Sequence, residues 1–458
     1  MCPVVLLAMI MGFLMFLLEL TAAITVKFMP NRVDKLKVGD EKNVSFSLVD
    51  FKIEDRSQYQ VLVADPFVAD VKNNVFNQTE IRGSGTNSET YNGSFILTGK
   101  FLGHTYVRVK AVSKSEFKDD ESEPLKISVI RKESTLSKVF IVSVATLVSL
   151  NYINMGCALD MNIILAVLKK PIAPAIGFGC QYVFMPLIAY GIGKLLFDSP
   201  ILQLGLFIFG CSPGGGASNM WTVLLNGNLD LSITMTFIST LTSLGMMPLW
   251  IFTLGKTLFN GTTRIPFKNI FISLVSMVIP LGIGLLIQKF FPKAAKLGRR
   301  ILAPACILMI IYIVAFGTYA NLYMFKLFSW RVVIAALINV WFGFLVGALA
   351  ARLIGRPVED VIAIAVETGV QNTGISIVLL GFSLPQPDAD LASVAPVAAS
   401  IMMPIPLVII YIIQKIRACC RNEHKDAVQE DVTKEEKHTK VLESPTSTDT
   451  TIAVNEHM

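Results

Sequence analysis

A proline and three consecutive glycines interrupt an otherwise apolar run in the stretch Gly210-Cys211-Ser212-Pro213-Gly214-Gly215-Gly216-Ala217-Ser218-Asn219. A continuous helix through this stretch is improbable, because proline cannot donate a backbone hydrogen bond and glycine is a poor helix former. A break inside a membrane helix strands backbone carbonyls and amides, which are tolerated only where they are buried in protein or line a polar cavity. The stretch therefore predicts a broken helix beside a binding site, with the break at Pro213, Gly214, Gly215 and Gly216.

A second polar segment interrupted by glycine lies inside a later apolar run, at Ala365-Val366-Glu367-Thr368-Gly369-Val370-Gln371-Asn372-Thr373-Gly374. Transporters built on internal repeats place such breaks near the bilayer midplane, in corresponding positions of their two halves. The second segment carries Gly369, Asn372 and an acidic residue, Glu367. Together the two segments predict an α-helical fold of two related halves, each with one broken helix.

The composition places both breaks in a membrane protein. Of the 458 residues, 53% are hydrophobic and 16% are charged, and the mean hydropathy of +0.59 is too high for a soluble protein of this size. Residues 137–416 contain apolar runs of about 20 residues, the length that crosses a bilayer. About nine spans are predicted, near 138–158, 172–195, 201–225, 231–255, 269–290, 300–320, 331–354, 358–383 and 391–414.

Basic residues between the spans concentrate on alternate loops. One set of loops carries Lys169, Lys170, Lys289, Lys293, Lys296, Arg299, Arg300, Arg352, Arg356, Lys415, Arg417 and Arg421, whereas the other carries only Lys194, Lys256, Arg264, Lys268, Lys326 and Arg331. Cytoplasmic loops are the basic ones, so the region before the first span is predicted outside and the C-terminus inside, with the plasma membrane as the expected location. Because this topology accounts for the formal charge of +6, a nucleic-acid partner is not predicted; the oligomeric state stays open.

Residues 1–23 have the features of a cleaved signal peptide, since an apolar stretch ends in the small residues Ala22 and Ala23. No basic residue stands near Met1, so a retained first membrane helix remains the alternative. Residues 417–458 are rich in charged and hydroxyl side chains with little to bury. They predict a disordered cytoplasmic tail.

Residues 24–134 form a separate polar region in which short runs alternate apolar and polar residues between turns. This period of two predicts six or seven half-buried strands in a small β-sandwich of Ig-like size, although the Cys-Trp-Cys pattern is missing. Three glycosylation sequons lie in this one region, at Asn43, Asn77 and Asn92. Their clustering predicts a glycosylated domain outside the cell.

Glu367 is the one acidic residue predicted deep within a span. A carboxylate inside the membrane is costly and marks a functional site by default. All four histidines lie outside the spans, so a cation is a better partner for this carboxylate than a proton relay.

Hard oxygen donors surround both breaks, and two of them share one helix face at a spacing of four residues. These donors are Ser218, Asn219, Gln371, Asn372 and Thr373 near the breaks, with Ser232 and Thr236 on the shared face. Ligand sets made only of oxygen suit Na⁺ and not the metals that prefer thiolate or imidazole. The alternative is that the breaks serve only close packing and that the hydroxyls bond across helices.

These segments closely resemble the bile acid:sodium symporter family over about residues 138–414. The motifs that carry the resemblance are the first break, Gly227-Asn228-Leu229-Asp230-Leu231-Ser232, the run 236–248, Gln181-Tyr182, Met185-Pro186-Leu187 and Glu367-Thr368-Gly369-Val370-Gln371-Asn372. The resemblance implies an inverted-repeat transporter whose two broken helices cross, within a core domain that moves against a panel domain. It also implies Na⁺ as the coupling ion and no further cofactor.

The resemblance further implies two Na⁺ sites that share Glu367. One ion would be held by Ser218, Asn219, Ser232, Thr236 and Glu367, and the other by Gln181, Glu367, Gln371 and the backbone carbonyls of Thr368 and Val370. Two such ions beside one carboxylate leave about one positive charge in a site of low dielectric, and a monovalent organic anion would offset it.

The sequence therefore predicts a secondary active transporter for Na⁺-coupled uptake of an amphipathic organic anion, of the bile acid or steroid sulfate class, by alternating access. A transport-inactive membrane receptor or adhesion protein acting through its N-terminal domain is the alternative. An enzyme is not predicted, because the chain shows no set of nucleophile, base and orienting residue.

Overall fold

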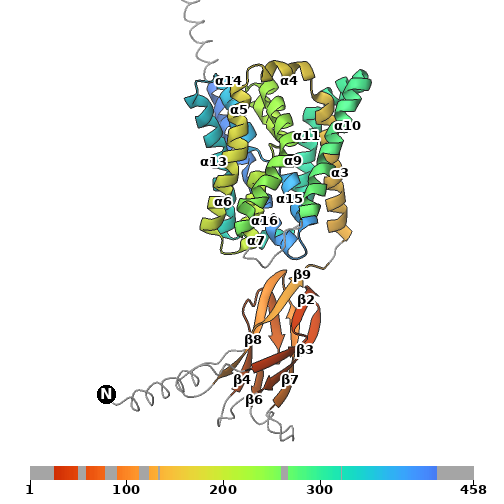
Figure 1. The fold of residues 1–458 in the computed structure, drawn as a ribbon, viewed down its shortest axis with the longest axis vertical. Helices are drawn as coiled ribbons and strands as arrows, with labels where there is room; N and C mark the ends of the chain where they lie inside the picture. Colours follow the sequence, from red (N-terminus) through yellow and green to blue (C-terminus); the bar gives the residue numbers. More distant parts are fainter. Residues whose placement is uncertain are drawn as a thin grey trace, which may run out of the picture.

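The computed structural model describes residues 25–49, 58–77, 90–112, 123–132, 135–258, 267–320 and 322–419. The predicted signal peptide and nearly all of the predicted cytoplasmic tail lie outside these residues. The described chain forms a β-sandwich followed by a helical bundle. Figure 1 shows the two stacked end to end, with β9 at the junction.

Two sheets form the sandwich. The first has the strand order β1 (Thr25–Met29), β3 (Glu41–Val49), β7 (Thr90–Gly99), β5 (Ala69–Lys72), and the second has the order β2 (Arg32–Lys37), β9 (Leu125–Ile130), β8 (Gly103–Val112), β4 (Gln58–Val63), β6 (Val75–Asn77). All pairings are antiparallel except that of β2 with β9. Alternate residues of the strands, including Phe46, Leu48, Phe95, Val107 and Ile127, point inward and fill one buried cluster.

The β-rich region is confirmed, but the strand count of six or seven was too low, since the described residues hold nine strands. The two shortest strands, β5 and β6, have four and three residues. Strands this short contain too few residues to establish an alternating pattern.

Each predicted span falls on one helix or on two helices separated by a break. The helices are α3 (Thr135–Ala158), α4 (Met161–Leu168), α5 (Ile172–Gly179), the π-helical turn η1 (Cys180–Phe184), α6 (Met185–Leu196), α7 (Pro200–Cys211), α8 (Ala217–Leu224), α9 (Leu229–Phe252), the 3-10 turn η2 (Leu254–Leu258), α10 (Phe267–Phe290), α11 (Pro292–Ala320), α12 (Leu322–Phe325), α13 (Trp330–Leu353), α14 (Val358–Gly369), α15 (Thr373–Ser383) and α16 (Asp388–Met402), which a further helix extends to Cys419. Within the described residues, four helices are by themselves long and apolar enough to cross a membrane, or five if one bent pair counts as a span. The chain is therefore a multi-pass membrane protein with a β-rich N-terminal region.

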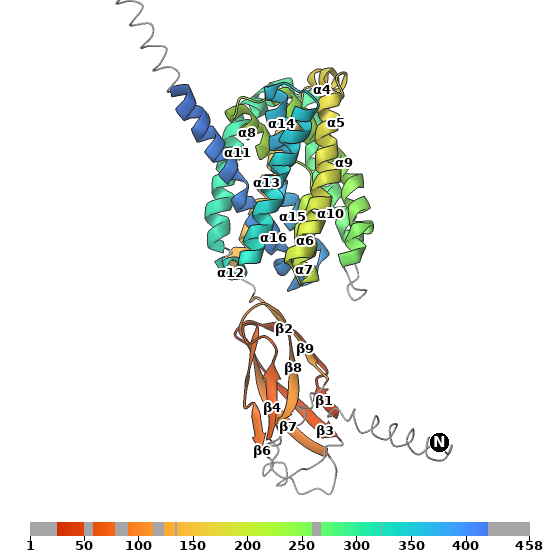
Figure 2. The ribbon, with the colours of Figure 1, turned by 90° about the vertical axis from the view of Figure 1, so that its left-hand side faces the viewer.

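The helices form two groups. In the α3 group, α10 and α11 pack against α3; in the α13 group, α6, α14 and α16 pack against α13, and α7 packs against α6 and α16. Between the groups lie α9 and α15, both of which contact α10. Figures 1 and 2 show this arrangement from two directions, with α3, α10 and α11 along one side of the bundle in Figure 1.

An internal repeat relates helices that lie far apart in the sequence. The helix that starts at Ile172 and the one that starts at Trp330 begin 158 residues apart, and so do α7 at Pro200 and α14 at Val358. Helices α7 and α14 also share a length of 12 residues. Both end at a break, which places the two breaks in equivalent positions.

Candidate functional site

The two breaks pair with each other through their backbones. Gly214 and Gln371 form an antiparallel bridge. Beside it the Gly215 amide donates to the Val370 carbonyl at 2.7 Å, and the Asn372 amide donates to the Pro213 carbonyl at 2.9 Å. Each break thus supplies hydrogen-bond partners for backbone groups that the other break leaves without a helical partner. Inside a membrane such groups must be hydrogen-bonded within the protein.

Glycine is required at the bridge for a steric reason. A Cβ atom on Gly214 would lie 2.0 Å from Oε1 of Glu367, and one on Gly215 would lie 2.8 Å from the Gln371 carbonyl oxygen. Both distances are shorter than real Cβ contacts. A side chain at Gly215 would push the two backbones apart, and one at Gly214 would displace the Glu367 carboxylate. Glu367 can therefore lie directly against the first break.

Hydroxyl groups from two helices converge on one oxygen of Glu367. Ser218 of α8 donates to Oε2 at 2.6 Å, and Thr236 of α9 donates to the same atom at 2.9 Å. Ser232, one turn before Thr236, donates to Oδ1 of Asn219 at 2.9 Å. The structure thus brings together the whole first set of predicted ligands, and each of these five side chains is at most 6% exposed.

The second predicted set also converges. Gln181, on the π-helical turn η1, donates through Nε2 to Oε1 of Gln371 at 2.8 Å and to the Ser212 carbonyl at 2.6 Å. The carbonyl of Thr368 accepts from Nε2 of Gln371 at 2.8 Å, and that of Val370 accepts from Gly215. Each carbonyl keeps a second lone pair for another partner.

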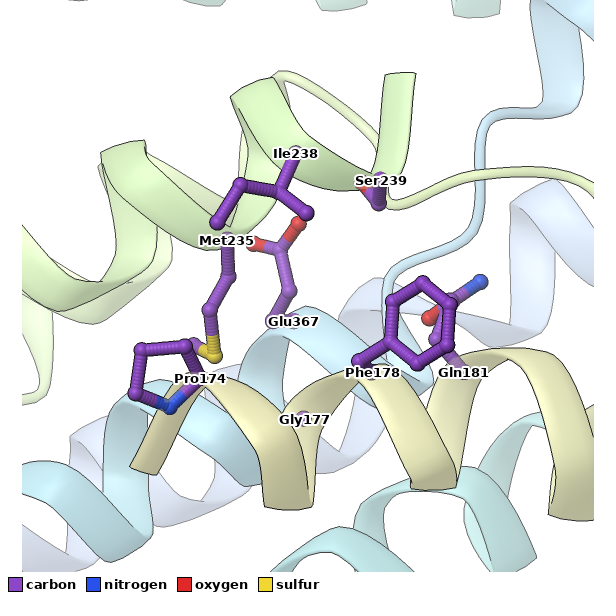
Figure 3. Close-up of a pocket in the computed structure, with 8 residues that line it drawn as sticks. All are labelled: Pro174, Gly177, Phe178, Gln181, Met235, Ile238, Ser239 and Glu367. Atoms are coloured by element: carbon purple, nitrogen blue, oxygen red, sulfur yellow. The ribbon is translucent and has the colours of Figure 1, made fainter. Parts of the chain in front are cut away.

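Two buried acceptors at this site have no hydrogen-bond partner among the described residues: Oε1 of Glu367 and Oε1 of Gln181. Both side chains line a small cavity of about 10 Å³, together with Pro174, Gly177, Phe178, Met235, Ile238 and Ser239. Figure 3 shows Glu367 between α9 and the helix that carries Gln181, with its carboxylate directed toward α9. A cavity of this size has room for about one water-sized particle.

Acceptor oxygens without donors attract a cation. The predicted ligands beside Glu367 are side-chain hydroxyls and amides and backbone carbonyls, and no thiolate or imidazole lies among them. Hard oxygen sets of this kind fit Na⁺. The geometry agrees with the predicted ligand sets, and their binding of Na⁺ stays a prediction.

Three residues at the site were missed from the sequence. Ser212 donates to Oε1 of Gln371 at 3.2 Å, Ser239 accepts from the Gly214 amide at 3.3 Å, and Tyr152 of α3 accepts from the Asn372 amide group. The position of Ser212 inside the first break was an available signal. Tyr152 gave none, since its partner lies 220 residues away.

Comparison with known proteins finds one matching family model and several similar transporters. The model of the Sodium Bile acid symporter family matches residues 145–327, a range that begins within α3 and leaves out the β-sandwich. The ileal sodium/bile acid cotransporter of Oryctolagus cuniculus is 34% identical over 265 residues, which cover 56% of this chain and 76% of that protein. The sodium-dependent organic anion transporter of Bos taurus is 34% identical over 253 residues (54% and 66%), and the hepatic sodium/bile acid cotransporter of Homo sapiens is 31% identical over 238 residues (51% and 68%).

Proposed function

The chain belongs to the Sodium Bile acid symporter family, and from that premise we propose that it takes up an amphipathic organic anion together with Na⁺ by alternating access. Members of a symporter family are transporters and not enzymes, and their coupling ion is Na⁺. The names of the relatives suggest bile acids and other organic anions as the substrate class.

The observation that carries this proposal is the arrangement of Glu367. One of its oxygens is held by Ser218 and Thr236, and the other has no donor among the described residues and borders a small cavity. A buried carboxylate in this arrangement is stabilised by a bound cation. We assign one Na⁺ to Ser218, Asn219, Ser232, Thr236 and Glu367, and a second to Gln181, Glu367, Gln371 and the carbonyls of Thr368 and Val370.

The charge balance supports an anionic substrate. Two Na⁺ ions and one carboxylate leave about one positive charge in a region of low dielectric. A monovalent carboxylate or sulfate that enters beside the ions removes this excess. Na⁺ and the anion therefore bind better together than apart, which is the thermodynamic requirement for symport.

The proposal includes an orientation. The β-sandwich lies outside the cell, because Asn43 and Asn92 are exposed on β3 and β7 and each begins a glycosylation sequon. The C-terminal end lies in the cytoplasm, as the basic loops predict. The bundle resides in the plasma membrane, where an outside substrate can reach it.

The test is uptake of radiolabelled taurocholate and of a steroid sulfate by cells that express the chain, in Na⁺ buffer and in choline buffer. The expected result is uptake above that of mock-transfected cells in Na⁺ buffer only. If the protein reaches the cell surface and neither buffer supports uptake of any tested anion, the transporter proposal is wrong and the receptor alternative gains support.

A further inference from the structure

The β-sandwich contacts the helical bundle through a histidine–carboxylate hydrogen bond and an ion pair at the start of α16. Nε2 of His104, at the beginning of β8, lies 2.5 Å from Oδ1 of Asp388, and Nε of Arg131, just after β9, lies 3.0 Å from Oδ2 of Asp390. Both acidic residues stand in the first turn of α16, where the helix dipole also favours negative charge. The sandwich thus presents its basic groups to the acidic end of one helix.

The Arg131 pair is the more buried of the two. The Asp390 side chain is only 9% exposed and that of Arg131 is 21% exposed. Arg131 also donates through Nη1 to the Tyr323 hydroxyl of α12 at 3.1 Å, and Gln386 donates to Oδ1 of Asp390 at 3.1 Å. Separating these groups would leave a buried carboxylate without its counter-charge, which is costly.

The sandwich is attached to both helix groups in different ways. Its covalent attachment is to the α3 group, because β9 ends at Ile130 and α3 begins at Thr135. Its two polar contacts through His104 and Arg131 are with α16, which packs in the α13 group. Figure 2 shows the sandwich beneath the bundle, with α12 and α16 labelled in the lower part of the bundle.

We propose that the β-sandwich is a clamp on the transport cycle, docked on α16 through His104 and Arg131 in the arrangement seen here and released from α16 when the two helix groups shift past each other. The inference rests on the proposed function, since alternating access requires such a shift. A short covalent connection to one group and polar contacts to the other cannot both stay unchanged while the groups move. The contacts of His104 and Arg131 with α16 are the part that can break and re-form.

The direct test cross-links the β-sandwich to α16 in the docked arrangement. In a His104→Cys/Asp388→Cys protein, a short bifunctional methanethiosulfonate reagent joins the two sites and a reductant frees them. Uptake should fall by about tenfold or more on cross-linking and return on reduction, because a cycle held in one state cannot be completed. The matched control is Lys27→Cys/Ser47→Cys, which joins opposite residues of β1 and β3 within the sandwich and should leave uptake unchanged.

A second readout separates this inference from the proposed function. The rate of cross-linking at His104→Cys/Asp388→Cys should differ by about twofold or more between Na⁺ and choline buffer, because Na⁺ shifts the balance between the two states. If wild-type protein shows no uptake and this rate still responds to Na⁺, the Na⁺-dependent docking of the sandwich on α16 stands and the transport proposal fails.

Three results would overturn the clamp: full uptake by the cross-linked protein, a cross-linking rate indifferent to Na⁺, or no cross-link at the interface where the control pair reacts. If the first cysteine pair fails to reach the cell surface, Arg131→Cys/Asp390→Cys reports on the same interface. The same three outcomes then apply to that pair.

Discussion

The two helix breaks have related backbones and different chemistry. Helices α7 and α14 have the same length and end in breaks that pair with each other across one antiparallel bridge. Yet the residue that corresponds to Glu367, 158 positions earlier, is Phe209, which is fully buried. The first break contributes glycine, hydroxyl groups and the Asn219 amide, whereas the second contributes the carboxylate and the Gln371 amide.

This difference shows how a repeated fold acquires a polar site. The repeat sets the geometry, in which two backbones satisfy each other inside an apolar bundle. The chemistry comes from side chains that the repeat does not copy. Because only one half carries a carboxylate, the negative charge lies on one side of the bridge, next to Ser218 and Thr236.

The largest expected effect comes from removing the charge that distinguishes the second break. Glu367→Gln should lower Na⁺-dependent uptake by about 30-fold or more, since losing one partner of a buried charge pair costs about 2–5 kcal/mol and each 1.4 kcal/mol is tenfold. The matched control is Glu359→Gln, at an exposed position in the first turn of the same helix, which should transport as wild type does. Normal uptake by Glu367→Gln at a normal surface level would show that transport does not need the carboxylate.

The next effect comes from adding one methyl group to the first break. Gly214→Ala places a Cβ where Oε1 of Glu367 lies, so uptake should fall by about tenfold or more even though alanine favours helix by about 1 kcal/mol. Gly381→Ala in α15 is the control, because nothing lies within 4 Å of a Cβ at that position. Equal uptake by the two variants would mean that the close approach of the breaks has no functional role.

A smaller effect is expected from removing one hydroxyl of the first ligand set. Ser232→Ala should raise the Na⁺ concentration for half-maximal uptake by about two- to tenfold, because one neutral hydrogen bond contributes about 0.5–1.5 kcal/mol. Ser243→Ala on the same helix removes a hydroxyl that bonds only to the backbone one turn back, and should leave the Na⁺ dependence unchanged. A shift of the same size in both variants would point to a general weakening of α9.

The smallest effect on transport is expected from the glycosylation sites, which lie far from both breaks. Treatment with an N-glycosidase should lower the apparent mass of the wild type and not that of an Asn43→Gln/Asn77→Gln/Asn92→Gln variant, while Na⁺-dependent uptake per surface molecule stays close to normal. An identical mass before and after treatment of the wild type would contradict the predicted location of the sandwich outside the cell.

What the sequence revealed depended on local signals. Pro213 with its three glycines, and an acidic residue in an apolar run, are visible within a few residues. The sequence could therefore point to both segments, and α7 and α14 end within them at Cys211 and Gly369. The pairing of Gly214 with Gln371 joins residues more than 150 positions apart, and the contact of Arg131 with Asp390 spans more than 250. Such contacts depend on tertiary packing, which period and composition do not encode.

The π-helical turn that carries Gln181 was also missed. Nothing in Cys180-Gln181-Tyr182-Val183-Phe184 distinguishes it from ordinary helix, because the wider turn follows from packing. Such turns are frequent at functional sites. Here it holds the Gln181 amide against Gln371 and the first break.

Equilibrium binding of radioactive Na⁺ to the purified protein tests the central claim most directly, because it measures the proposed ligand without requiring the right substrate. The account predicts about two ions per chain, as two oxygen sets sharing one carboxylate allow, and almost none in Glu367→Gln, with Glu359→Gln as the control. Saturable binding of the same stoichiometry in Glu367→Gln, or no saturable binding by the wild type, would contradict the claim that the paired breaks form the Na⁺ site.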